Sequence, residues 1–108
     1  MHPFFIKTCD KWQLVEPSDI LWISKSGSQP NYLNICTLDA VFNTRMSLSK
    51  IERILPREEF LRIHKSYVVS LKHIRTVSRN FGHVMVHSKR VPIGESYVNQ
   101  LRAALTFV

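Results

Sequence analysis

The sequence predicts a mainly β domain with one or two short helices. Short runs of β-branched and aromatic residues recur along the 108 residues, separated by segments rich in Gly, Pro, Asn and Ser. Only residues 47–55 and the segment from residue 95 onward place apolar side chains at helical spacing. A chain of this length buries roughly two-thirds of its unfolded surface, so we expect one core and a single domain over residues 1–108.

The first half of the chain alternates apolar strand patterns with polar segments. Strands are expected over residues 4–8, 20–23, 32–37 and 41–45. Between the first two lies the segment 14–19, in which Ser18 and Asp19 can form a turn or a single helical turn. Residues 24–31 are all polar, Gly or Pro, which predicts an exposed loop.

Residues 47–55 predict a helix, because their apolar side chains recur at helical spacing. Ser49 and Glu52 can form a capping box, and Pro56 ends the run. The second half then predicts a β-meander with strands over residues 61–64, 67–71, 74–78, 83–87 and 90–92. Residues 79–82 form one turn and Ser88-Lys89 a two-residue link. A terminal helix is expected from Glu95, with residues 105–108 frayed.

The charge balance favours an anionic partner. The chain carries 15 Lys and Arg against 8 Asp and Glu, which gives a net charge of +7 with neutral histidines. Nucleic acid and an acidic membrane surface both fit this charge. The sequence contains neither an apolar run long enough to span a bilayer nor the pattern of a signal peptide, so we expect a soluble, cytoplasmic protein without a membrane partner.

Metal and catalytic sites are not predicted. Cys9 and Cys36 lie far apart without a CxxC motif, as expected for reduced structural thiols. His83 and His87 fall in an expected strand, where this spacing separates them by about 13 Å, too far for one metal ion. The sequence also lacks phosphate-loop, HExxH and Gly-x-Ser-x-Gly motifs, and its carboxylates lie beside turns or on the helix. We therefore expect neither enzyme activity nor a cofactor.

Basic side chains crowd a segment that otherwise reads as strand, residues 60–74. A stiff backbone carrying exposed donors suits the recognition of phosphates and base edges. Within the segment, His64 either reads a base or packs against its neighbours with a hydrogen bond to the backbone. Lys65 faces the opposite way along the strand, so it is the better candidate for a DNA contact.

Other side chains leave alternatives open. Asn31, at the end of the polar loop, is either a turn residue or a reader of adenine through its amide. Trp12, Trp22 and Phe81 could stack on the bases of a single strand, although the apolar surroundings of Trp22 favour core packing.

Four segments together resemble a known family. They are residues 19–23, residues 47–56 with Phe60, residues 62–74 and residues 91–97. The central block, Arg-Ile-His-Lys-Ser-Tyr-Val-Val-Ser, is close to the pattern RxHxSxxVN. The chain resembles, over nearly its whole length, the LytTR DNA-binding domain, which is usually the output half of bacterial response regulators of the LytR/AlgR type. The resemblance implies an elongated arrangement of about ten short strands in small sheets with one or two short helices.

The resemblance also implies how DNA is read. Loop and turn side chains of the family enter two successive major grooves, with contacts across the intervening minor groove. The first reading position then falls on Asn31 and Gln29, and the second falls on Lys65. The third falls at Glu95, where many members have Arg, so that either Ser96 or Asn99 contributes instead or this edge binds weakly. The family asparagine after the Val-Val pair is Ser70 here.

Taken together, these observations predict sequence-specific binding of double-stranded DNA for transcription regulation. The candidates for phosphate contacts are Arg62, Lys72, Arg75, Arg79, Lys89 and Arg90. The chain would be the C-terminal part of a longer two-component regulator, whose receiver or other regulatory domain lies outside it. Two copies would pair on repeated half-sites as a homodimer on DNA. The alternatives are an RNA or single-strand binding module, and a protein-interaction module with incidental basic charge.

Overall fold

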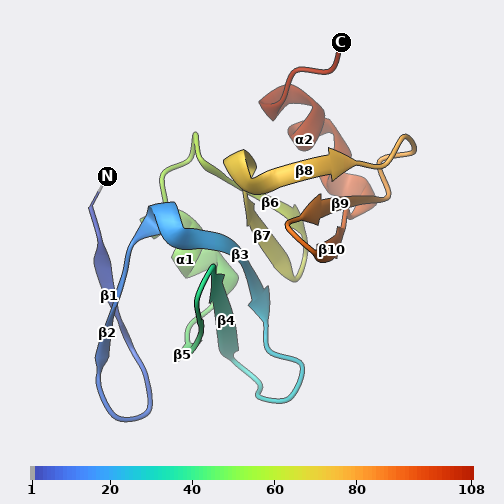
Figure 1. The fold of residues 1–108 in the computed structure, drawn as a ribbon. Coiled ribbons are helices and arrows are strands. Elements are labelled where there is room, and N and C mark those ends of the chain that lie inside the picture. The colour runs from blue at the N-terminus through green and yellow to red at the C-terminus, as the bar shows by residue number, and fades with distance from the viewer. Residues whose placement is uncertain (1) are drawn as a thin grey trace.

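Three antiparallel sheets hold the ten strands of the computed structural model, which describes residues 2–108 (Figure 1). The strands are β1 (Phe4–Lys7), β2 (Trp12–Val15), β3 (Ile20–Lys25), β4 (Tyr32–Thr37), β5 (Val41–Arg45), β6 (Phe60–His64), β7 (Tyr67–Ser70), β8 (Ile74–Val77), β9 (His83–Val86) and β10 (Lys89–Pro92). The molecule measures 46 × 30 × 24 Å. The expected elongated, mainly β fold is therefore confirmed.

The central sheet has five strands in the order β5-β4-β3-β7-β6. Strand β3 pairs with β4 on one side and with β7 on the other, where Ile23 lies opposite Val68. This pairing joins the two halves of the chain. The prediction of one continuous meander in the second half was wrong in part, because the β6–β7 hairpin belongs to the central sheet and only β8, β9 and β10 form a separate one.

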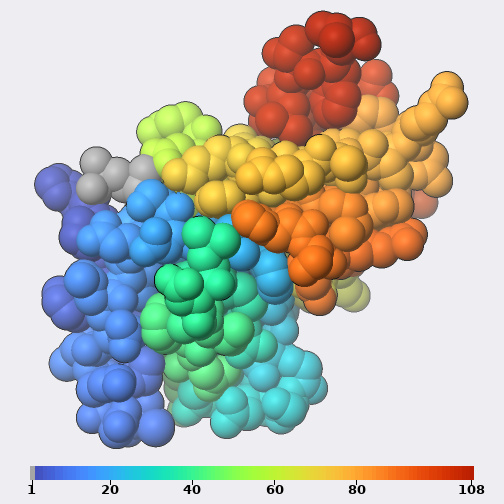
Figure 2. All heavy atoms as spheres, viewed as in Figure 1, coloured from blue at the N-terminus to red at the C-terminus, as the bar shows by residue number. Residues whose placement is uncertain are grey.

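A strand that the sequence did not predict, β2, pairs with β1 in a two-stranded ribbon. Ile6 and Val15 are buried on the inner face of this ribbon, whereas Phe5 and Leu14 are exposed on the outer face. In Figure 2 the ribbon (blue) runs along one side of the molecule. The strand was missed because its four residues offer only one full alternation of exposed and buried side chains before Glu16.

The helices are short. Helix α1 covers Leu48–Ile54, α2 covers Val98–Ala104, and single 3-10 turns cover η1 (Pro17–Asp19), η2 (Leu71–His73) and η3 (Glu95–Tyr97). The expected helical turn before β3 is thus confirmed. The predicted capping box at Ser49 was wrong: the cap is Ser47, whose Oγ accepts a hydrogen bond from the Lys50 N–H at 3.1 Å. The terminal helix begins with the 3-10 turn at Glu95.

Two clusters of buried side chains, rather than the single core expected, lie on the two faces of the central sheet. Val68 packs in one cluster with Ile51 of α1, while its neighbour Val69 packs in the other with Leu101 of α2. Successive side chains of a strand point to opposite faces, so β7 contributes to both clusters. The second cluster also fixes the β8–β10 sheet through Val84.

The last hairpin turns one residue earlier than the sequence predicted. His87 lies in the β9–β10 turn with a φ of 52°, so the link is His87-Ser88, one residue before the predicted one. Its ring lies 5.5 Å from the ring of His73.

In the part of the chain that the structure describes, no cluster of three or more metal-ligating side chains occurs. Across residues 2–108 neither helix has the length and apolar character needed to cross a bilayer.

Candidate nucleic-acid interface

The turn between β6 and β7 presents Lys65 to solvent. The side chain of Lys65 is exposed, and it donates no hydrogen bond to any of residues 2–108. Beside it, the Nδ1 atom of His64 accepts a hydrogen bond from the Ser66 N–H at 3.0 Å, and the His64 ring meets the ring of Tyr67 edge-on at 5.6 Å. The structural interpretation of His64 therefore fits: its ring closes the turn that carries Lys65.

The protonation state of His64 follows from the same contacts. Burial lowers the pKa of His64, and the positive charges of Lys65 and Arg62 lower it further. Since Nδ1 accepts the Ser66 N–H, the proton of the neutral ring sits on Nε2. His64 is therefore a neutral side chain at physiological pH, and it adds no charge to the turn.

Arg62 clamps this turn from the inside. Its Nη2 donates to the carbonyl oxygen of Lys65 at 2.6 Å and its Nε donates to that of His64 at 3.3 Å. Its Nη1 forms an ion pair with Glu52 of α1 at 2.9 Å. The Arg62 side chain is only 20% exposed. All three nitrogens of the guanidinium, which the sequence suggested for phosphate contact, are thus engaged by protein groups.

The loop of residues 26–31 lies next to this turn. The Lys25 N–H, at the end of β3, donates to the carbonyl oxygen of Ser66 at 3.0 Å, which ties the start of the loop to the β6–β7 turn. Both the loop and the turn project toward the lower side of the view in Figure 1, away from α2. The first and second predicted reading positions are therefore brought together.

Local hydrogen bonds shape the 26–31 loop. The Ser26 Oγ accepts from the Gln29 N–H at 3.1 Å, and Asn31 has a φ of 68°, in the left-handed region that Asn tolerates better than most residues. The Asn31 carbonyl oxygen accepts from the Met46 N–H at 3.1 Å, which anchors the loop to the end of β5. The side chains of Gln29 and Asn31 remain exposed.

The third predicted reading position also lies close to the β6–β7 turn. The Gly94 N–H donates to the carbonyl oxygen of Ile63 at 2.8 Å. A Cβ on Gly94 would lie only 2.9 Å from the Tyr97 ring, so glycine fits best at this position. Glu95 and Ser96 follow directly and are exposed, as is Asn99 in the first turn of α2.

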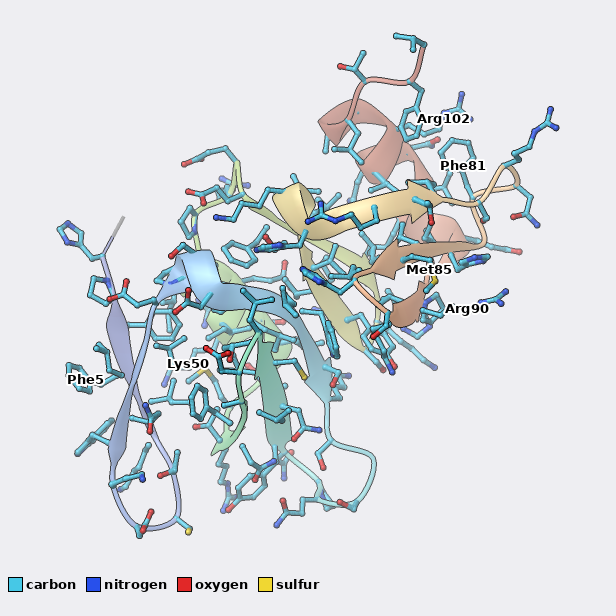
Figure 3. All side chains as sticks on the ribbon, in the orientation of Figure 1. Phe5, Lys50, Phe81, Met85, Arg90 and Arg102 are labelled. Atoms are coloured by element: carbon cyan, nitrogen blue, oxygen red, sulfur yellow. The ribbon has the colours of Figure 1, made fainter. Side chains whose placement is uncertain are left out.

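The remaining phosphate candidates are spread over several surfaces. Lys72 and Arg75 lie beyond the end of β7 opposite to the Lys65 turn, in η2 and at the start of β8. Arg79 is exposed in the β8–β9 connection. Arg90 is exposed on β10 and extends away from the body of the molecule in Figure 3. The Lys89 Nζ lies over two aromatic rings, 6.0 Å from the centroid of Trp22 and 5.7 Å from that of Tyr67.

The three candidate stacking residues have different environments. Trp22 is partly buried against the second core cluster, as expected. Phe81 is covered by its own neighbours, because Phe107 meets its ring at 5.3 Å and the Arg102 guanidinium lies 4.7 Å above it (Figure 3). Trp12 is 65% exposed on the β1–β2 ribbon. The single-strand hypothesis required both Trp12 and Phe81 to be exposed, and only Trp12 meets this requirement.

Sequence reasoning missed the two residues that support the Lys65 turn from other elements. Glu52 was expected to act in a helix cap, yet it anchors Arg62. Gly94 was assigned no role, yet its N–H donates to the Ile63 carbonyl oxygen at 2.8 Å, and a side chain there would crowd the Tyr97 ring. Both contacts depend on how α1 and the 94–97 turn pack against β6, and no local signal in the sequence encodes that packing.

The structure defines a mainly β domain that presents basic and amide side chains from loops and turns, an arrangement suited to nucleic-acid recognition without a recognition helix. The family model of the LytTr DNA-binding domain matches residues 10–106. The chain belongs to this family, which is a family of DNA-binding domains and not of enzymes. The resemblance expected from the sequence is confirmed.

Similar proteins are bacterial regulators. The chain is 23% identical over 108 residues to the sensory transduction protein LytT of Bacillus subtilis, covering 96% of this chain and 44% of that protein. It is 30% identical over 98 residues to the CO-responsive transcriptional regulator RcoM of Rhodospirillum rubrum, covering 86% and 40%. The chain thus spans about two-fifths of the length of these relatives.

A solved structure has the same fold. It is the LytTr DNA-binding domain of a putative methyl-accepting/DNA response regulator from Bacillus cereus, with a TM-score of 0.81 and 24% identity. The match covers 99% of both chains. The arrangement of three small sheets and short helices is therefore the fold of that LytTr domain.

Proposed function

We propose that this domain binds double-stranded DNA sequence-specifically and regulates transcription, with Lys65 and the 26–31 loop as its main reading elements. The observation that carries the proposal is the clamped β6–β7 turn. Arg62 and His64 fix its backbone, while the Lys65 side chain extends into solvent without a protein partner among residues 2–108. A donor held on a rigid support loses little entropy when it binds a base edge.

Each reading side chain suits a particular base edge. A Lys ammonium donates to the O6 and N7 atoms of guanine in the major groove, and an Asn or Gln amide pairs with adenine. The hydrogen bond between Lys25 and Ser66 links the two reading elements, so Lys65 and Asn31 would bind in a fixed register. The net charge of +7 would attract the phosphates of either groove.

The third reading position differs chemically from the other two. Glu95 carries a negative charge, so it would repel phosphates and could only accept a hydrogen bond, for example from the N4 amino group of cytosine. Ser96 and Asn99 are exposed beside it and could contact DNA instead. We propose that this edge contributes less affinity than the Lys65 turn.

The phosphate candidates divide by their contacts. We propose Arg90 and Arg79 as the more available ones, since both are exposed. Lys72 and Arg75 would reach only a phosphate on the far side of β7, and Lys89 would have to leave its two aromatic rings. Arg62 is better described as a positioning residue, because its guanidinium already holds the turn.

The chain spans only part of its relatives, so its regulation is a proposal. We propose that it is the C-terminal, output part of a longer regulator, in which a receiver or another regulatory domain controls pairing. Two copies on repeated half-sites would gain affinity through effective concentration, without any new contact to DNA. No cofactor is required, because binding needs only positioning and charge neutralisation.

A binding selection on random duplex DNA at moderate salt tests this function. We expect a short motif, repeated about one helical turn apart, that is bound as duplex in preference to its single strands or to an RNA duplex. A preference for the single strands would instead support the binding mode that the exposed Trp12 favours. Binding without a salt dependence would point to the protein-interaction alternative.

A further inference from the structure

A basic cleft lies between the β1–β2 connection and the 26–31 loop. Its volume is about 420 Å³, and it is lined by Lys7, Thr8, Cys9, Gln29, Tyr32, Asn43 and Arg45. Gln29 belongs to the predicted reading loop, so the cleft shares a wall with the DNA-reading surface. None of the basic residues of this cleft was among the phosphate candidates from the sequence.

The two cations of the cleft are held by the sheet. The buried Thr44 donates through its Oγ1 to the carbonyl oxygen of Lys7 at 2.8 Å, which fixes the end of β1 against β5. Arg45 is the register partner of Tyr32 at the edge of the central sheet. The backbones that carry Lys7 and Arg45 are therefore fixed relative to each other and to the 26–31 loop, which ends just before Tyr32.

No carboxylate of residues 2–108 forms an ion pair with these cations. The cleft lining contains neither Asp nor Glu, and the one ion pair within residues 2–108 joins Arg62 to Glu52. Asp10, the acidic residue of the β1–β2 connection, lies outside the lining and accepts a weak hydrogen bond from the Cys9 Sγ at 3.9 Å. Two positive charges thus face a cleft whose other side chains are neutral.

We propose that this cleft binds a backbone phosphate of the DNA, immediately beside the base pairs read by the 26–31 loop. The inference rests on the proposed function and extends its footprint to the β1–β2 ribbon. Lys7 and Arg45 would neutralise the phosphate and release its counterions. The Asn31 carbonyl oxygen binds the N–H of Met46, the residue after Arg45, so the phosphate contact and the reading loop would move as one unit. A contact of this kind sets the register of the protein on the duplex.

The salt dependence of binding tests the cleft. With a duplex recovered by selection, we would measure the affinities of the parent, Lys7→Ala and Arg45→Ala over a range of salt concentrations. Each cleft variant should bind more weakly to specific and unrelated duplexes alike, and its slope of log affinity against log salt should be shallower by up to about 0.9, the contribution of one phosphate. Arg45→Lys should keep the parent slope, because it keeps the charge.

Matched controls distinguish the effect of removing a cation of the cleft from the effect of removing a positive charge elsewhere on the protein. Lys50→Ala removes an exposed lysine of α1, and Arg102→Ala removes an exposed arginine of α2; both residues lie outside the cleft (Figure 3). Both controls should keep the parent slope. Equal slopes for the parent and for both cleft variants would overturn the proposal, as would a slope that falls equally in the controls.

A neutral DNA backbone locates the phosphate. Replacing single phosphates beside the selected site by methylphosphonates should reveal one position whose loss weakens the parent more than it weakens Arg45→Ala, in which Lys7 remains. If Lys65→Ala loses specificity while no such position exists, the cleft proposal fails and the proposed function stands. If the parent binds no duplex at all, both fail.

Discussion

The guanidinium of Arg62 donates to the carbonyl oxygen of Lys65 at 2.6 Å, across the turn between β6 and β7. The same side chain is paired with Glu52 at 2.9 Å, so the turn is anchored to helix α1. Two neighbouring basic residues therefore have different roles: one is turned inward to fix the backbone, and the other is left free to bind.

Arg62→Ala should reduce both stability and DNA affinity. Loss of the partly buried hydrogen bonds should cost about 1–2 kcal/mol in the free energy of unfolding. The affinity should fall as well, because Lys65 would no longer be presented from a fixed backbone. Thermal melts and binding isotherms measure the two effects.

A double-mutant cycle with Lys65→Ala separates positioning from direct contact. If Arg62 acts through Lys65, the double variant should bind little worse than Lys65→Ala alone. Fully additive losses in affinity would mean that Arg62 contacts DNA independently. Glu52→Gln is a milder companion variant, since it weakens the anchor and leaves Arg62 in place.

Glu95→Arg should strengthen DNA binding. The change removes a negative charge and adds a positive one at the third reading position, so the salt slope should steepen and the affinity should rise at low salt. Glu58→Arg makes the same charge change at an exposed site before β6 and serves as the control. An equal gain in both variants would show that only net charge matters.

The stability of the domain should fall as the pH is lowered through the range in which histidine titrates. Burial lowers the pKa of His64 in the fold, so the unfolded chain binds the proton more readily than the native one. The stability that the neutral His64 ring contributes to the fold is fully present above the unfolded pKa of about 6.5 and is lost progressively as the pH falls below it. His73 contributes with the same sign, because burial lowers its pKa too.

His64→Asn provides the control for this pH dependence. An Asn oxygen can accept the Ser66 N–H in place of Nδ1 and does not titrate. Melting temperatures measured between pH 5 and 8 should therefore vary less in His64→Asn than in the parent. If the melting temperature of His64→Asn varies with pH as much as that of the parent, the pH dependence comes from His73 or from other groups.

The two thiols should react very differently. Burial raises the pKa of Cys36 to about 11, and only 6% of the residue is exposed, so it stays a protonated thiol at neutral pH. Cys9 is exposed in the β1–β2 connection. A thiol reagent should modify Cys9 quickly and Cys36 only after denaturant is added. Rapid reaction of two thiols in the native protein would contradict the buried position of Cys36.

The strand pattern was predictable from sequence where it was long and apolar. Strands β3 and β4 each place buried residues at several positions, and Ser47 to Pro56 carries a clear helical spacing. The sheet order was not predictable, because the pairing of Ile23 with Val68 joins residues 45 positions apart. The cap was placed two residues late because Ser47 and Ser49 have the same chemistry, and only the backbone path chooses between them.

For the candidate site, sequence identified exposed side chains better than it identified their partners. Lys65, Asn31 and Glu95 lie on loops and turns and are exposed, as polar residues in such segments usually are. The partners depend on packing between distant elements, as the position of Lys89 over Trp22 illustrates. The cleft of Lys7 and Arg45 was missed for the same reason, since β1 and β5 meet only in the folded chain.

The reading role of Lys65 is tested by comparing the parent domain with Lys65→Ala on the selected duplex and on an unrelated duplex at one salt concentration. We expect the ratio of specific to unspecific affinity to collapse in Lys65→Ala, while the melting temperature stays within a few degrees of the parent's, as expected for an exposed residue. An unchanged ratio in a folded Lys65→Ala variant would show that the β6–β7 turn does not read the DNA.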